Sequence, residues 1–242
     1  KWISTFHSLC VKMLRIHGHL IGFNNNFTIY DQSDSTKLVR NCMRDSDIDT
    51  KQYSPKRIQA HISSLKNQRI LPGEAVEFAQ SFFDVKVAEI YSSYQKKLML
   101  ANSMDFDDLL IKAVELLETS DKSLNYWSSK FQYIMIDEYQ DTNMVQYRLV
   151  ELLASKHKNI CVVGDSDQSI YAFRGADIRN IEEFESDFKD AKVISLEKNY
   201  RSSQKILDIA NGVISNNPRK KEKKLWTDND EGLDVNLVEF NS

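Results

Sequence analysis

Three short apolar runs, each followed at once by polar residues, constrain the fold of this chain more than any other feature of its sequence. They are Phe131–Ile136, Asn159–Val163 and Lys192–Leu196, and patterns of helical period lie between them, over Val145–Ala154 and Ile178–Phe188. Short apolar strands that alternate with helices predict a parallel sheet with helices on both faces. The expected fold class is therefore α/β.

The sequence on either side of this region is expected to be helical. One helix is predicted over Phe106–Glu118, another over Ser203–Ile214 before a candidate strand at Val235–Phe240, and a first one begins at Ser4 or Thr5. Residues 27 to 100 read as helices throughout, including a long one that begins after Pro72. Paired acids and glycine loops are missing from that stretch, which predicts a helical subdomain without chemistry of its own.

Composition sets loose limits on function. The 242 residues are 41% hydrophobic and 28% charged with a net charge of −3, so the chain is not basic overall; DNA binding needs only local positive charge and is not excluded. Cys10, Cys42 and Cys161 lack metal-ligand spacing and predict buried thiols in a reducing cytoplasm. No apolar run is long enough to span a bilayer, so we expect no contact with a membrane.

Polar residues gather where the predicted strands end, at Asp137–Glu138, Gly164–Asp165 and Glu197–Arg201. Ligands of open parallel sheets bind beyond these carboxyl ends. The first group suits nucleotide hydrolysis, because Asp137 can hold Mg²⁺ beside the phosphates and Glu138 can orient and deprotonate the attacking water. Acid pairs are common, however, and a solvated strand end explains this one equally well.

The segment Val163–Gly175 combines glycine, acids, an amide, two aromatic residues and an arginine. The amide of Gln168 can sense a terminal phosphate. Tyr171 and Phe173 can stack on unpaired bases, a contact worth roughly 1–3 kcal/mol per base. Alternatively, both aromatic side chains belong to the core and Arg174 forms an ordinary ion pair.

In the segment Leu196–Ser202, Tyr200 can stack on a purine and Arg201 can reach the γ-phosphate. The alternative makes Ser202 a helix cap and Arg201 a surface residue.

Weaker signals complete the set of candidates. His7 can contact a DNA phosphate or base, although a histidine near a helix start is more often structural. The acids of Asp105–Leu109 are expected in a first helical turn because they complement the helix dipole. The basic run Arg219–Lys224 favours a solvated loop over phosphate contacts.

In this order the segments TFHSLC, DFDDLL, IDEYQDTN, VVGDSDQSIYAFRGA and LEKNYRSS resemble successive motifs of superfamily 1 DNA helicases of the UvrD/Rep/PcrA group. The resemblance covers nearly the whole chain. It implies an ATP-driven translocase that moves along single-stranded DNA with 3′ to 5′ polarity, unwinds duplex at single-strand/double-strand junctions, and works with repair or replication accessory proteins.

The resemblance also implies a role for each motif residue. Asp137 would bind Mg²⁺ and Glu138 would be the catalytic base. Gln168 would sense the γ-phosphate of ATP, Tyr200 would stack on adenine and Arg201 would be an arginine finger. The DNA track would comprise His7, Tyr171, Phe173 and Arg174, and Arg174 would also help to couple the two sites.

The implied domains are RecA-like. Residues 1–22 and 103–193 would be part of the first, termed 1A; residues 23–102 would be its helical insertion 1B; residues 194–242 would begin the second, 2A. Two departures stand out. Phe173 replaces the tryptophan usual in the family, which predicts weaker stacking. No G-x-x-x-x-G-K-[ST] loop occurs among the seven glycines, so we expect this chain by itself to be inactive as an ATPase.

Two other functions remain open at this point. The chain could be a module that binds single-stranded DNA or a partner without hydrolysis, or a piece of a helicase–nuclease of the RecB or AddA type. The intact acid pair, Gln168 and Arg201 favour an enzyme, and the compact spacing from Ser8 to Asp105 favours the simpler helicases.

Overall fold

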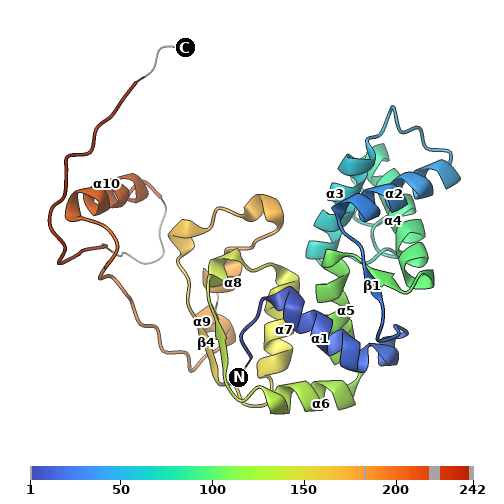
Figure 1. The fold of residues 1–242 in the computed structure, drawn as a ribbon, viewed down its shortest axis with the longest axis horizontal. Helices are drawn as coiled ribbons and strands as arrows, with labels where there is room; N and C mark the ends of the chain where they lie inside the picture. Colours follow the sequence, from blue (N-terminus) through green and yellow to red (C-terminus); the bar gives the residue numbers. More distant parts are fainter. Residues whose placement is uncertain (1, 183, 218–223, 240–242) are drawn as a thin grey trace. The chain divides into compact units, whose positions relative to one another are not determined.

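A computed structural model describes residues 2–182, 184–217 and 224–239. The chain divides into two compact units. The larger comprises Lys1–Asp165 and Ser169–Asn180, and the smaller comprises Ser166–Gln168 and Ile181–Ser242. Figure 1 shows the order of the elements along the chain.

Four helices enclose the first hydrophobic core of the larger unit: α1 (Phe6–His17), α5 (Phe106–Thr119), α6 (Asp121–Lys130) and α7 (Met144–Ala154). The strand β3 lies between α6 and α7 in the sequence, and α5 contacts each of the other three helices. Trp127 is fully buried in this core, and its indole donates a hydrogen bond to Nδ1 of His17 (3.1 Å). The predicted helices over Phe106–Glu118 and Val145–Ala154 are confirmed by α5 and α7.

A parallel pair of strands, β3 (Ile134–Ile136) and β4 (Ile160–Val162), carries the predicted alternation of strand and helix. The register pairs Ile134 with Ile160 and Ile136 with Val162. Both strands lie inside the apolar runs expected to form them. Short 3-10 helices follow each strand, at Tyr139–Asp141, Ser166–Gln168 and Ala172–Arg174.

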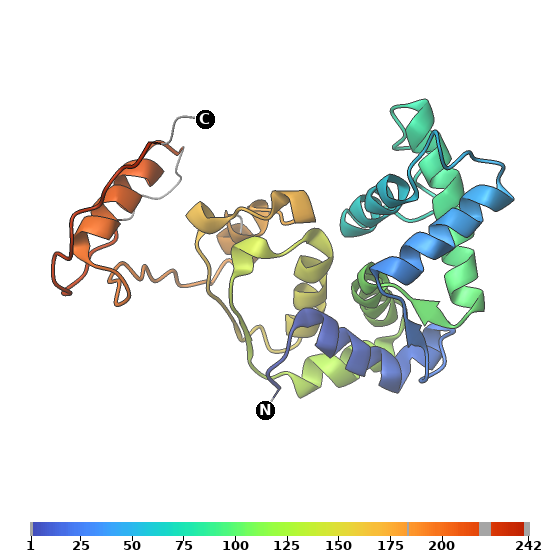
Figure 2. The ribbon, with the colours of Figure 1, turned by 45° about the horizontal axis from the view of Figure 1, so that its top comes forward.

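A second core lies among the helices α2 (Gln32–Asp45), α3 (Pro55–Asn67) and α4 (Phe82–Leu100), which pack on one another as a separate bundle (Figure 1; Figure 2). Two connections flank this bundle and pair as short parallel strands, β1 (Thr28–Ile29) and β2 (Ser103–Met104). A 3-10 helix at Gly18–Ile21 precedes the first of them. The bundle matches the helical stretch expected between residues 27 and 100.

The prediction that the long helix begins after Pro72 is wrong. It begins at Phe82, where the side chain of Ser81 accepts a hydrogen bond from the amide of Asp84 and caps the helix. Residues 71–79 form tight turns instead, with the amides of Glu74, Glu77 and Ala79 bonded to carbonyls three residues earlier. Gly73 lowers the helical preference of this segment, and the apolar spacing that includes Val76 does not outweigh it.

The smaller unit contains α9 (Phe184–Asp187) and α10 (Gln204–Ile214), and α10 confirms the helix expected at Ser203–Ile214. The predicted helix over Ile178–Phe188 is found as α8 (Arg179–Glu182) and α9, on either side of residue 183. The strand predicted at Lys192–Leu196 is wrong. Of the strand predicted at Val235–Phe240, residues 235–239 form no strand, and Phe240 lies outside the described residues. Within the described ranges, the backbones of these two segments pair with no neighbouring strand. The β-pairing described in this part of the chain is an isolated bridge between Lys198 and Trp226.

In the part of the chain that the structure describes, no helix combines the length and apolar character needed to cross a membrane.

Candidate active site

The two parallel strands bring two of the predicted polar groups together. Val163 donates its amide to the carbonyl of Ile136 (2.8 Å), and Tyr139 donates its amide to the carbonyl of Val163 (2.9 Å). These bonds extend the ladder just beyond β3 and β4. They place the backbone of Asp137–Glu138 beside that of Gly164–Asp165, at the sheet edge where ligands of parallel sheets bind.

Glu138 has a left-handed backbone conformation, with φ 51° and ψ 44°. This region is uncommon for residues other than glycine and costs about 1–3 kcal/mol where the surroundings impose it. The turn closes through a hydrogen bond from the amide of Asp141 to the carbonyl of Glu138 (2.9 Å). It leaves the carboxylates of Asp137 and Glu138 exposed to solvent. Strain of this kind is concentrated at functional sites.

Gln140 is a residue of this site that the sequence interpretation missed. Its buried side chain donates from Nε2 to Oε2 of Glu138 (2.9 Å) and accepts at Oε1 from the amide of Asp165 (2.9 Å). One amide therefore joins the acid pair after β3 to the loop after β4. An amide placed two residues beyond a pair of acids was the available signal, and only the tertiary pairing shows its use.

Asp137 fits the role of a magnesium ligand. Its carboxylate is exposed, and Oδ1 accepts a hydrogen bond from the amide of Glu138 (3.0 Å), which leaves lone pairs of both oxygens for a cation. Among the described residues no group of three or more acids, histidines or cysteines is arranged around a metal. A single carboxylate suits Mg²⁺, which keeps several waters and takes phosphate oxygens as further ligands.

The loop after β4 presents two aromatic rings. Phe173 is 77% exposed and Tyr171 is 36% exposed, so the alternative that both belong to the core does not hold for Phe173. Their ring centroids lie 6.0 Å apart. The loop is tied to the segment after the acid pair, because Thr142 O accepts from the amide of Asp177 (2.9 Å) and from Nδ2 of Asn180 (3.0 Å).

His7 lies in the first turn of α1, half-buried, with its ring centroid 5.8 Å from that of Phe106 at the start of α5. Burial lowers the pKa of His7, although the charge of Asp107 opposes this effect. The lowered pKa favours the neutral form of the imidazole. Any contact that it makes with DNA would use a hydrogen bond or the ring face rather than a positive charge.

The smaller unit carries Gln168, Tyr200 and Arg201. Oδ1 of Asn199 accepts from the amides of Arg201 (2.9 Å) and Ser202 (2.8 Å), which forms a tight turn that precedes α10. Tyr200 is 78% exposed, with Nζ of Lys198 5.3 Å from its ring centroid. The N-cap of α10 is Ser203. The alternative interpretation, in which Ser202 caps this helix, is therefore wrong.

Arg174 is the last residue of the 3-10 helix Ala172–Arg174, and its coupling role stays a prediction. In the basic run Arg219–Lys224, residues 219–223 lie outside the described residues.

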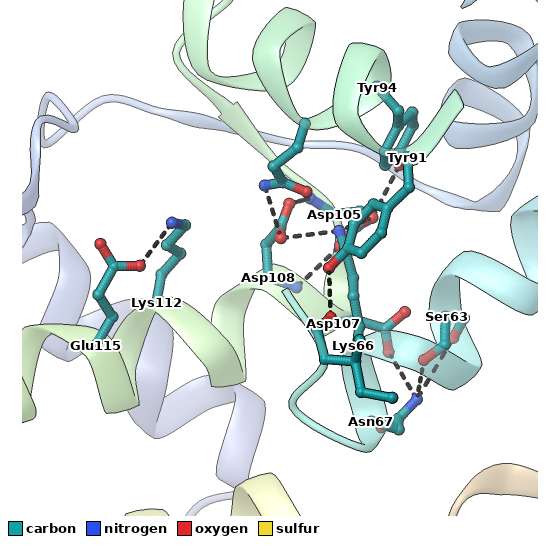
Figure 3. Close-up of polar contacts among 12 residues, drawn as sticks. Ser63, Lys66, Asn67, Tyr91, Tyr94, Asp105, Asp107, Asp108, Lys112 and Glu115 are labelled. Atoms are coloured by element: carbon teal, nitrogen blue, oxygen red, sulfur yellow. Dashed lines mark hydrogen bonds and ion pairs between the residues drawn. The ribbon is translucent and has the colours of Figure 1, made fainter. Parts of the chain in front are cut away.

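A buried ion cluster links the helical bundle to the start of α5 (Figure 3). The side chain of Lys66 is fully buried, and Nζ lies 2.7 Å from Oδ2 of Asp105 and 2.8 Å from Oδ1 of Asp108. Tyr94 donates to Asp105 (2.8 Å) and Gln95 donates to Asp108 (2.9 Å). The acids predicted only to complement the helix dipole do form a capping box, but they also hold this lysine.

The charged groups of the cluster shift the pKa values of one another. Burial disfavours the charged form of Lys66, but the two carboxylates outweigh it and raise the pKa of Lys66. Burial likewise opposes the charge of Asp105, but Lys66 holds the pKa of Asp105 below its usual range. Burial and the charge of Asp105 raise the pKa of Asp108 to about 6.

Comparison with known protein families identifies the class of this chain. Residues 1–189 match the UvrD/REP helicase N-terminal domain, and residues 194–242 match the UvrD-like helicase C-terminal domain. The chain belongs to the UvrD/Rep helicase family.

Similar curated proteins are ATP-dependent DNA helicases named PcrA. The protein of Bacillus subtilis strain 168 is 48% identical over 234 residues, which are 97% of this chain and 32% of that protein. The protein of Staphylococcus aureus strain Mu50 is 48% identical over 238 residues, 98% of this chain and 33% of its own length. The chain thus spans about a third of the length of these relatives.

Proposed function

We propose that this chain is part of an ATP-dependent DNA helicase that moves 3′ to 5′ along single-stranded DNA and unwinds duplex at junctions, in the cytoplasm. The observation that carries the proposal is the hydrogen-bonded path from Glu138 through Gln140 to Asp165. It connects an exposed acid pair to the loop with exposed aromatic rings. An acid pair can serve nucleotide hydrolysis, and exposed rings can stack on bases. Gln140 therefore connects a candidate site for hydrolysis to a candidate site for DNA contact.

The proposed domains follow the family pattern. Residues 1–22 and 103–193 belong to a RecA-like domain 1A, residues 23–102 to the insertion 1B, and residues 194–242 to the start of domain 2A. The two hydrophobic cores of the larger unit support the division between 1A and 1B, since α2, α3 and α4 share one core while α1, α5, α6 and α7 share the other.

In the proposed reaction Glu138 accepts a proton from the water whose oxygen bonds to the γ-phosphorus of ATP, while the bond from that phosphorus to the β,γ-bridging oxygen breaks and ADP leaves. Asp137 would hold Mg²⁺, which neutralises charge on the phosphate oxygens. Gln140 keeps the Glu138 carboxylate oriented. Gln168 and Arg201 would contact the γ-phosphate, and Tyr200 would stack on adenine. His7, Tyr171, Phe173 and Arg174 would contact the DNA strand, in keeping with the exposure of both rings.

Strand separation by the full-length protein tests this proposal. Duplexes with a 3′ single-stranded tail and with a 5′ tail are offered with ATP and Mg²⁺. We expect unwinding of the 3′-tailed duplex only. Unwinding of the 5′-tailed duplex alone would reverse the polarity, and unwinding of neither would refute the helicase function.

We further propose that the 242-residue chain alone is inactive, because it supplies no lysine loop to cradle the phosphates. Purified chain should show no ATP turnover above the buffer blank in a coupled phosphate-release assay. Turnover abolished by Glu138→Gln would show that the chain is catalytically sufficient.

Substitutions of Phe173 should change DNA affinity in opposite directions. Phe173→Ala removes an exposed stacking face and should weaken binding of single-stranded oligonucleotide by about 1–3 kcal/mol. Phe173→Trp enlarges the face and should tighten binding. Fluorescence anisotropy with the full-length protein measures both, and equal affinities for all three proteins would exclude Phe173 from the DNA track.

A further inference from the structure

Asn67, the last residue of α3, lies where the helical bundle meets the loops of the candidate site. Its side chain makes bonds in two directions. Oδ1 accepts from Nδ2 of Asn143 (2.5 Å), while Nδ2 donates to the carbonyl of Ser63 (2.9 Å) and approaches Oδ1 of Asp107 (3.4 Å). In Figure 3, dashed lines join the side chain of Asn67 to Ser63 and to Asp107. One amide thus touches the bundle, the start of α5 and the start of α7.

Asn143 belongs to the segment that follows the acid pair. It is the N-cap of α7, and its Oδ1 accepts from the backbone amide of Gln146 (2.9 Å), while Oε1 of Gln146 accepts from the backbone amide of Asn143 (2.9 Å). The cap uses the oxygen of the Asn143 side chain, so its Nδ2 is left for Asn67. Asn143 is 7% exposed, and without Asn67 this buried donor would lose its partner among the described residues.

The aromatic loop also closes on Asn67. Gly175 has φ +87°, and a Cβ built on it would lie 3.1 Å from Cβ of Asn67. Side chains rarely adopt that backbone conformation, and the space beside it is already taken. The loop backbone after Phe173 therefore rests on the side chain of Asn67. The same loop is hydrogen-bonded to Thr142, the residue before Asn143. Asn67 therefore contacts both segments that these bonds join: the aromatic loop at Gly175 and the segment after the acid pair at Asn143.

We infer that Asn67 is a positioning residue through which the helical bundle holds the aromatic loop in register with the segment after the acid pair. The inference rests on the proposed function, since it assigns Asn67 to the coupling between DNA contact at Tyr171 and Phe173 and hydrolysis at Glu138. Asn67 touches neither nucleotide nor DNA in this assignment. Its loss should leave the chemistry intact and weaken the acceleration of that chemistry by DNA.

The test compares Asn67→Ala with Gln68→Ala in the full-length protein. Gln68 is a matched control: it is the next residue, the C-cap of α3, and it is exposed. Among the described residues its side-chain amide bonds to Ser64 of the same helix, at O (3.2 Å) and Oγ (3.1 Å). With saturating single-stranded DNA, Asn67→Ala should lower the kcat for ATP by about tenfold, the scale typical of mutations within coupling networks. The DNA-free rate and the KM for ATP should not change.

A double-mutant cycle with Asn143→Ser separates coupling from simple destabilisation. Serine retains a capping oxygen for α7 and removes the Nδ2 donor. If the Asn67–Asn143 bond is the connection, the double variant should lose no more DNA stimulation than the worse single variant. The inference would be overturned if the losses of DNA stimulation were additive in the double variant. It would also be overturned if Asn67→Ala lowered the rate of ATP hydrolysis equally with and without DNA, or if this variant kept its DNA stimulation. Absence of stimulation in the unmutated protein would instead refute the proposed function on which the inference rests.

Discussion

Replacing Glu138 by glutamine should lower the DNA-stimulated kcat of the full-length protein by about 100- to 10,000-fold, the usual contribution of a general base. Glutamine has nearly the same shape, and its oxygen can still accept the hydrogen bond from Gln140. The left-handed turn is therefore preserved, and only the ability to take a proton is lost. The affinity for a fluorescent ATP analogue should stay within about threefold, because the loss concerns the transition state.

Glu89→Gln provides the control for this variant. Glu89 is an exposed residue of α4 paired with Lys86 (2.9 Å), within the helical bundle, and its loss should leave kcat unchanged. Full activity in Glu138→Gln would mean that another group accepts the proton. Loss of nucleotide binding together with kcat would mean that Glu138 supports the site structurally.

Replacing Lys66 by methionine should lower the free energy of unfolding of the chain by about 3–5 kcal/mol at pH 7, because it leaves two carboxylates buried without their cation. Methionine fills a similar volume, so the change removes charge rather than packing. Asp105 and Asp108 are 7% and 1% exposed and cannot recover full hydration in the folded state. Urea unfolding followed by circular dichroism measures the loss.

The loss should depend on pH in a defined direction. Asp108 already has a pKa of about 6 in the folded chain, and removal of Lys66 raises it further. Between the unfolded pKa near 4 and this higher value the folded variant binds more protons than the unfolded one, so its stability falls as pH rises. The deficit should therefore be smaller at pH 5 than at pH 8. Lys37→Met, which removes an exposed lysine of α2, should match the unmutated chain at both pH values. A Lys66→Met deficit that is absent or independent of pH would contradict a charged cluster.

Local pattern predicted the strands and helices that carry the candidate site. The acid pair and Gly164 were expected at one sheet edge, because parallel strands end on the same side, and β3 and β4 confirm this arrangement. Helices with strong apolar periodicity, such as α5 and α10, were found within a residue or two of their expected bounds. These features depend on residues that are close to one another in the sequence, so the sequence pattern is sufficient to predict them.

Features that depend on distant partners were missed or wrong. Lys66 follows Leu65 on an amphipathic helix, and nothing nearby in the sequence distinguishes it from an exposed lysine; its partners lie 39 and 42 residues away. Gln140 and Asn67 acquire their roles in the same way, through contacts between segments. The apolar run Lys192–Leu196 has the composition of a strand, but a strand requires a neighbour, and none pairs with it among the described residues.

The rate of ATP hydrolysis by the full-length protein, measured with and without single-stranded DNA, decides most directly whether the acid pair and the aromatic loop form one motor. We predict slow hydrolysis without DNA and a rate at least about tenfold higher with saturating DNA, a ratio within the usual range of coupling between two sites. A protein that binds DNA but hydrolyses ATP at the same rate with or without it would contradict the coupling, and one with no hydrolysis at all would be a binding module.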